Sequence, residues 1–254
     1  MSLGTTIEWT QATWNPVTGC TKVSSGCEHC YAERLAKRLQ AMGNPNYRNG
    51  FQVTLHPHML ELPCHWRTSR LVFVDSMGDL FHEEVPTAYI QQVFQVMERC
   101  PQHTFQLLTK RSARLPQLNA LLPWPDNVWL GVTVENNDYM YRLDDLRATH
   151  AATRFLSFEP LLGPIDSPDL TDITWAIVGG ESGPGARPMK HEWVANLRDT
   201  CVDQRVSFFF KQWGGLNKKK AGRLLDGRMW SDRPSAMESS IRTQIVRTRG
   251  KDAI

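Results

Sequence analysis

Short runs of apolar residues recur along the chain from residue 71 onward. They are rich in β-branched and aromatic side chains and are apolar at nearly every position, which is typical of parallel strands buried on both faces. The runs cover residues 71–75, 104–109, 128–134, 153–158, 174–178 and 206–211.

Amphipathic segments alternate with these runs. The first, residues 31–42, places Tyr31, Leu35, Leu39 and Met42 on one helical stripe. Further helices are predicted over residues 85–99, 112–122, 136–149 and 191–204.

This alternation, with one more strand just before Cys20, predicts about seven βα units. Parallel strands need crossover connections, and repeated right-handed crossovers favour an α/β fold with a complete or partial parallel (β/α) barrel of the TIM-barrel type. A doubly wound sheet is the alternative. We expect a single barrel domain over residues 1–233, with an irregular insertion at residues 44–70 and a flexible C-terminal tail at residues 234–254.

The composition is that of an ordinary globular protein, with 41% hydrophobic and 22% charged residues. No apolar stretch approaches the roughly 18 residues of a membrane-spanning helix, and the N-terminal residues lack a signal-peptide pattern. The sequence therefore predicts a cytoplasmic protein with no membrane partner and with reduced thiols. A net charge of +3 is too small to indicate nucleic-acid binding by itself.

The strongest chemical signal is a cluster of three cysteines, Cys20, Cys27 and Cys30, directly before the first predicted helix. Thiols so close together in a cytoplasmic chain can converge on one metal centre. Iron–sulfur clusters require thiolate ligands, and three of them on a four-iron cluster leave one iron open for a substrate or cofactor.

Other interpretations of the cysteines stay open. A structural zinc site would use the same three thiols with His29, Cys64 or His65 as the fourth ligand, and thiols without any metal are a further alternative. Cys100 and Cys201 fall at the ends or apolar positions of helices, which is typical of buried packing thiols.

Polar residues follow the end of every predicted strand. In βα barrels the carboxyl ends of the strands gather functional groups on one rim, so these residues are expected to share a pocket. The loop at residues 179–188 adds four glycines and two prolines, and it suits either a close backbone approach to a ligand or a wide, rigid turn.

Five sequence segments carry a resemblance to a known family. The segments are TWNPVTGCTKVSSGCEHCYAERLAKR, LTKR, GVTVEN, SFEPLLGPI and VGGESGPGARPM. Over about residues 7–233 the chain resembles the phage-associated three-cysteine-motif proteins, which are similar in turn to radical S-adenosylmethionine (SAM) enzymes of the spore-photoproduct-lyase kind. The resemblance implies a barrel of the radical SAM type, a [4Fe–4S] cluster on Cys20, Cys27 and Cys30, SAM at the open iron, and an electron donor.

The chain departs from the usual radical SAM pattern in two places. The first cysteine gap holds six residues instead of three, and the Gly-Gly-Glu segment follows the sixth strand instead of the second. Ser76 and Asp79 are therefore the better candidates to meet the SAM amino group. The adenine and ribose are expected along a rim that includes Glu135, Glu159, Gly179, Gly180 and Glu181, and the candidate catalytic residues are Lys110 and Lys211.

The rim carboxylates also have a structural interpretation, in which Glu159 and Glu181 pair with Lys110, Arg187 or Lys211. The resemblance favours a base of DNA or RNA as the substrate of a 5′-deoxyadenosyl radical. The alternative function is a non-catalytic metal-binding module, with zinc or an iron–sulfur cluster, that binds a nucleic acid or a protein and is of phage or prophage origin.

Overall fold

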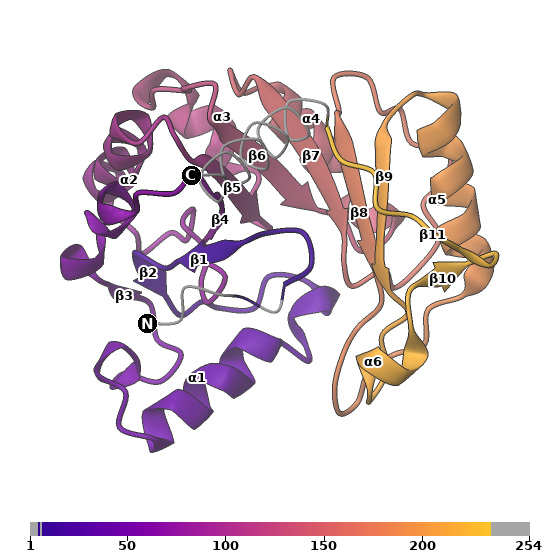
Figure 1. Ribbon diagram of the computed structural model, residues 1–254, viewed down its shortest axis with the longest axis horizontal. Coiled ribbons are helices and arrows are strands. Elements are labelled where there is room, and N and C mark those ends of the chain that lie inside the picture. The colour runs from indigo at the N-terminus through magenta and orange to yellow at the C-terminus, as the bar shows by residue number, and fades with distance from the viewer. Residues whose placement is uncertain (1–4, 6, 235–254) are drawn as a thin grey trace, which may run out of the picture.

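The computed structural model describes residue 5 and residues 7–234, and its centre is a parallel sheet curled into a half-barrel (Figure 1). Each strand pairs with the strand that follows it in the sheet order, and every pairing is parallel. In that order the strands are β1 (Ala12–Trp14), β4 (Leu71–Val74), β5 (Thr104–Thr109), β6 (Val128–Thr133), β7 (Thr153–Phe158), β8 (Trp175–Gly179) and β9 (Ser207–Gln212). The partial parallel barrel is therefore confirmed. β1 and β9 are the two ends of its strand order, and residues 230–232 pair antiparallel with part of β9.

Helices pack against one face of this sheet. The larger core joins outward-facing strand residues, such as Val72 and Leu130, to Phe94, Leu143 and Leu197 of three helices. The α-helices are α1 (Tyr31–Ala41), α2 (Thr87–Arg99), α3 (Arg114–Leu118), α4 (Tyr141–Arg147), α5 (His191–Asp203) and the short α6 (Lys218–Ala221). Because α2 to α5 share one core on one face, the doubly wound alternative is excluded.

A smaller, mostly aromatic core fills the concave face. Trp175 is fully buried there and contacts the rings of Trp9, Trp129, Phe155 and Phe209. Successive strand residues point to opposite faces, so one strand supplies both cores. These rings close the hollow of the half-barrel at the amino ends of the strands and leave the carboxyl ends free for polar groups.

Two predicted helices are shorter than their apolar pattern suggested. The segment expected over residues 112–122 is helical only in α3 and continues as the 3-10 turn Asn119–Leu121. Pro116 lies in the first turn of α3, where its missing N–H costs little. The segment expected over residues 136–149 divides into the 3-10 turn Asn137–Tyr139 and α4.

Most of the predicted apolar stripe of α1 does not face a core. Tyr31, Leu35 and Met42 are exposed, and only Leu39 of the stripe is partly buried. Ala32 and Ala36 are buried against Tyr47 and Met77, and Leu39 packs against the same cluster. Small side chains let the helix approach its neighbours closely, so the buried face of α1 is its alanine face. That part of the prediction was wrong.

The insertion at residues 44–70 is built from turns. It contains the 3-10 turns Pro45–Tyr47, Pro57–Met59 and Leu62–His65, and β3 (Thr54–Leu55), which pairs with β2 (Val17–Thr18). The predicted tail at residues 234–254 lies outside the described residues except for residue 234. A short hairpin of β10 (Leu224–Leu225) and β11 (Arg228–Met229) precedes it. No helix in the described part of the chain is long and apolar enough to cross a membrane.

Cys64 of the insertion forms a disulfide with Cys100, which follows α2, with 5.7 Å between the Cα atoms. This corrects three expectations, because the two thiols are not reduced, Cys100 is not a lone packing thiol, and Cys64 is not free to bind zinc. The remaining cysteines, Cys20, Cys27, Cys30 and the buried Cys201, are free.

Candidate functional site

The three clustered cysteines lie on one loop at the carboxyl end of the first strand. We call residues 19–30 the cysteine loop. Gly19 opens it with φ +84°, and a Cβ at this position would lie 2.2 Å from the carbonyl oxygen of Gln52, so only glycine fits against the insertion. Cys27 ends the 3-10 turn Ser25–Cys27, and Cys30 is the N-cap residue of α1.

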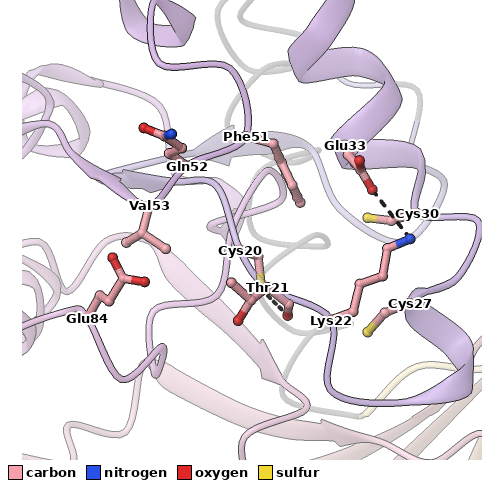
Figure 2. Close-up of a pocket in the computed structure, with 10 residues that line it drawn as sticks. All are labelled: Cys20, Thr21, Lys22, Cys27, Cys30, Glu33, Phe51, Gln52, Val53 and Glu84. Atoms are coloured by element: carbon pink, nitrogen blue, oxygen red, sulfur yellow. Dashed lines mark hydrogen bonds and ion pairs between the residues drawn. The ribbon is translucent and has the colours of Figure 1, made fainter.

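All three thiols line one pocket of about 690 Å³ (Figure 2). Its wall is completed by Phe51 and Val53 of the insertion, by Glu33 of α1 and by Glu84. The figure shows the three cysteine side chains around a common space, with Lys22 close to Glu33 at its edge. The loop thus brings the predicted metal ligands together on one cavity.

Two consecutive cations lie near two of the thiols. Burial alone would raise the pKa of Cys27, but Lys110 and hydrogen bonds from Val23 and Ser24 outweigh it and lower that pKa. Burial and Asp79 raise the pKa of Cys20 to about 12, although Arg111 opposes them with a hydrogen bond and its charge. Lys110 and Arg111 therefore act on different cysteines.

Arg111 holds the first part of the loop. Its guanidinium donates to the Thr21 carbonyl at 3.0 Å and to the Thr21 hydroxyl at 2.7 Å, and it pairs with Glu83. The side chain of buried His82 also hydrogen bonds to the Thr21 hydroxyl, at 2.9 Å. These contacts fix the residue next to Cys20.

Glu135 contacts and supports the middle of the cysteine loop. It is fully buried, and its carboxylate pairs with Lys110 at 2.7 Å and with Arg142 at 2.8 Å, and accepts from the Ser24 hydroxyl at 2.5 Å. A Cβ on Gly26 would lie 2.5 Å from Glu135 Oε1. Ser24 and Gly26 of the cysteine loop therefore contact this carboxylate directly, so a shift of the Glu135 side chain would also displace the loop.

Glu159 and Lys211 form the ion pair of the next rim position. The Nζ–Oε distances are 2.7 and 2.9 Å, and both side chains are partly exposed. A Cβ on Gly179 would approach the Glu159 carboxylate to 3.2 Å, while a Cβ on Gly180 would lie 2.2 Å from the Trp213 carbonyl oxygen. Gly180 is thus required by the Trp213 backbone, whereas a side chain at Gly179 would only need Glu159 to shift by a few tenths of an ångström.

The segment after β4 is firmly hydrogen bonded. Asp79 is buried and accepts from the Thr109 hydroxyl and from the backbone N–H groups of Phe81 and Lys110. Burial raises the pKa of Asp79, and these donors lower it in part. Ser76 donates its hydroxyl to Asn15, so both predicted SAM contacts are already engaged with the protein.

Glu181 belongs to the loop at residues 179–188, which we call the glycine-rich loop. Its carboxylate is held by the backbone N–H and Nε of Arg187, both at 2.9 Å, and by Nη2 at 2.7 Å. Burial opposes the charged form, but these bonds lower the pKa of Glu181. Of the ion pairs considered from the sequence, the structure shows Glu159 with Lys211 and Glu181 with Arg187.

Sequence reasoning missed several residues that shape the site. Arg142 is fully buried beside Glu135, Ser24 joins the cysteine loop to Glu135, and His82 binds Thr21 of that loop. None of these roles stood out in the sequence. The only available signal was an arginine within an otherwise apolar helical stripe beside Leu143 and Leu146.

Comparison with protein-family models assigns the chain to a family by its sequence. A family model described as "Protein of unknown function (DUF5131)" matches residues 4–234. The chain belongs to this family. Comparisons with curated proteins and with solved structures give no match. Membership of DUF5131 covers the half-barrel and the cysteine loop together, but it assigns them no activity.

Proposed function

We propose that this DUF5131 protein holds a [4Fe–4S] cluster through Cys20, Cys27 and Cys30 and acts as a radical SAM enzyme with a barrel of that type. The observation that carries the proposal is that three free thiols line one pocket at the mouth of a parallel half-barrel. Three thiolate ligands leave one iron of a four-iron cluster open.

The ligands available favour a cluster over a single zinc ion. A structural zinc site takes four protein ligands, and two of the fourth ligands considered are engaged elsewhere. Cys64 is in a disulfide, and the His65 ring hydrogen bonds to the Glu61 carbonyl. A four-iron cluster needs only the three thiolates of the cysteine loop.

The charges around the pocket also suit this group. A cluster with three thiolates carries net negative charge, and positive neighbours stabilise it in a partly buried site. Lys110 acts on Cys27, and Arg111 lies 3.9 Å from the sulfur of Cys20.

When bound, such a cluster would donate one electron to SAM and so yield methionine and a 5′-deoxyadenosyl radical. Ser76, Asp79, Glu159 and the backbone of Gly179 and Gly180 are the groups that we propose for SAM. Contact with SAM would replace hydrogen bonds that Ser76 now makes to Asn15 and Asp79 to Thr109. Glu135 supports the loop beneath it.

Lys110 and Lys211 are the candidate catalytic groups, since each ammonium is fixed by a rim carboxylate and part of each side chain is exposed. A nucleic-acid base, the substrate class implied by the resemblance to lyases that act on DNA, is the proposed substrate. The sequence also implies a cytoplasmic setting and a phage or prophage origin.

Anaerobic reconstitution with iron and sulfide tests the proposal. We expect about four irons per chain and a broad absorption near about 400 nm. Replacing Cys20, Cys27 or Cys30 with Ala should abolish both signals, whereas Cys201→Ala, in α5, is the matched control and should retain them. With a reductant, the loaded protein should release 5′-deoxyadenosine from SAM.

Two outcomes would decide against this function. Stoichiometric zinc without iron uptake would support the non-catalytic metal-binding module instead. Iron loading without release of any 5′-deoxyadenosine would support the cluster assignment but contradict the radical SAM chemistry.

A further inference from the structure

The glycine-rich loop contacts the cysteine loop and the first turn of α1 across the mouth of the half-barrel. The contacts join residues that are 148 to 162 positions apart in the sequence. Because β1 and β9 lie at opposite ends of the strand order, pairing within the sheet does not connect these two regions. Side chains supply the connection.

Arg187 is the centre of this contact. While its Nε and Nη2 bind Glu181, the same Nη2 donates to the Ser25 carbonyl at 2.8 Å, and Nη1 donates to Glu28 at 3.1 Å. Ser25 and Glu28 flank Cys27 on either side. The carboxylate of Glu181, whose side chain is only 4% exposed, thus orients a guanidinium that grips the turn carrying Cys27.

A second arginine, on the other side of the contact, donates from α1 to the glycine-rich loop. Arg34 of α1 donates to the carbonyls of Ser182 at 3.0 Å and Pro184 at 3.4 Å. A Cβ on Gly183 would lie 2.4 Å from Arg34, and one on Gly185 would lie 3.0 Å from His29. Both glycines have positive φ, so the backbone of the loop is shaped to fit these side chains.

From these contacts we infer that the glycine-rich loop is a clasp for the cysteine loop, with Arg187 as its positioning residue and Glu181 as the group that orients Arg187. The inference rests on the proposed function only in naming a cluster as the group that the cysteines hold. It assigns Glu181 to the clasp instead of to SAM.

The test measures thiol reactivity in the metal-free, full-length chain. Each cysteine is followed separately by mass spectrometry during alkylation with iodoacetamide. We expect Arg187→Gln and Glu181→Gln to speed alkylation of Cys27 and Cys30 by about 5- to 30-fold, because the turn opens more often without its clasp. Buried Cys201 is the internal reference, and its rate should not change.

Matched variants separate the clasp from a general loss of structure. Arg198→Gln removes an arginine that pairs with Asp199 and Asp226 away from the loop, so it should leave Cys27 and Cys30 at the wild-type rate. The double variant of Glu181 and Arg187 should react no faster than Arg187→Gln alone, since both residues act through one contact. Arg34→Gln provides a milder variant and should show the same effect with a smaller amplitude.

The inference is overturned if Cys27 and Cys30 react at the wild-type rate in Arg187→Gln and Arg34→Gln, or if Cys201 accelerates in parallel with them. It is also overturned if Glu181→Gln leaves the rates unchanged. Because no metal is present in this assay, its result stands whether or not the wild-type chain takes up iron. Failure of the cluster proposal is therefore distinguishable from failure of the clasp.

Discussion

The sheet and the cysteine loop are stabilised by different kinds of interaction. Every residue of β4, β6 and β8 is buried, and each strand is fixed by backbone bonds to both neighbours. None of residues 20–30 is buried in the same way, and the loop is held by side chains from Glu135, Arg111 and Arg187.

Because of this difference, substitutions in the sheet and in the cysteine loop should affect different properties, the stability of the fold in one case and the reactivity of the thiols in the other. Burial of large apolar side chains dominates the free energy of folding, so substitutions in the sheet should lower the stability of the protein most. Polar contacts at a partly exposed loop contribute much less, so substitutions there should disturb the thiols first. Glu135 belongs to both regions, because it is fully buried and also supports the loop.

The largest effect is expected in the concave core. Trp175→Ala removes a ring that is fully buried among other aromatic rings, and it should lower the free energy of unfolding by about 3–5 kcal/mol. Urea denaturation measures the loss. Tyr141→Ala also removes an aromatic ring, but from an exposed position, and should change stability by less than about 0.5 kcal/mol. Equal losses in both variants would contradict this assignment of the core.

Glu135→Gln should produce the next largest effect. It leaves Arg142 buried without its charged partner, and we expect a loss of about 3 kcal/mol by urea denaturation, together with faster alkylation of Cys27. Glu33→Gln is the control, because its pair with Lys37 is exposed and should be worth less than about 0.5 kcal/mol.

The pH dependence of this effect has a definite sign. Burial opposes ionisation of Glu135, but Lys110, Arg142 and Ser24 outweigh it and hold the pKa of Glu135 below 4.5. A lowered pKa in the folded state stabilises the protein above the unfolded pKa, and that stability is lost as the pH falls through the folded value. The difference between wild type and Glu135→Gln should therefore be full at neutral pH and shrink below about pH 4.5. A constant difference down to acid pH would show that the charge is not its source.

The sheet could be predicted from the sequence because its strands are buried on both faces. A short, continuous apolar run such as residues 104–109 or 153–158 suits a fully buried strand better than a surface helix or a loop, and both were predicted with the observed bounds. The stripe of α1 was misassigned, because helical spacing identifies a face but not what covers it. The turns of the insertion have no periodicity, so the contact of Cys64 with Cys100 left no trace in the pattern.

The site was predictable only in part, for a related reason. The spacing of Cys20, Cys27 and Cys30 places the thiols on one loop whatever the fold. The side chains that hold this loop come from distant segments, as Ser24 and Glu135 illustrate at a separation of 111 residues. Glycine content alone did not distinguish a ligand loop from one that fits Arg34 and His29, because both need the same backbone freedom.

The disulfide gives a third, smaller effect, and it links the insertion to the end of α2. Denatured wild-type protein should show four reactive thiols without a reductant and six with one. Reduction should lower stability by about 2–3 kcal/mol, because it frees a loop of intermediate length in the unfolded chain. Cys64→Ser should be as stable as the reduced wild type and insensitive to reductant. Six thiols without reductant would contradict the bond.

The smallest effect is expected on the exposed stripe of α1, where the sequence pattern and the structure disagree. Leu35 is 39% exposed, so Leu35→Gln should change the free energy of unfolding by less than about 0.5 kcal/mol. The neighbouring Ala36 is fully buried near Tyr47 and Met77, and Ala36→Gln should cost about 1–3 kcal/mol through overpacking and an added polar group. The two variants introduce the same side chain one position apart, so helix propensity and the polarity of glutamine nearly cancel in the comparison. The difference between them then reports mainly which of the two positions is covered. If Leu35→Gln cost as much as Ala36→Gln in urea denaturation, the stripe would be covered after all, and α1 would face a partner through its leucines.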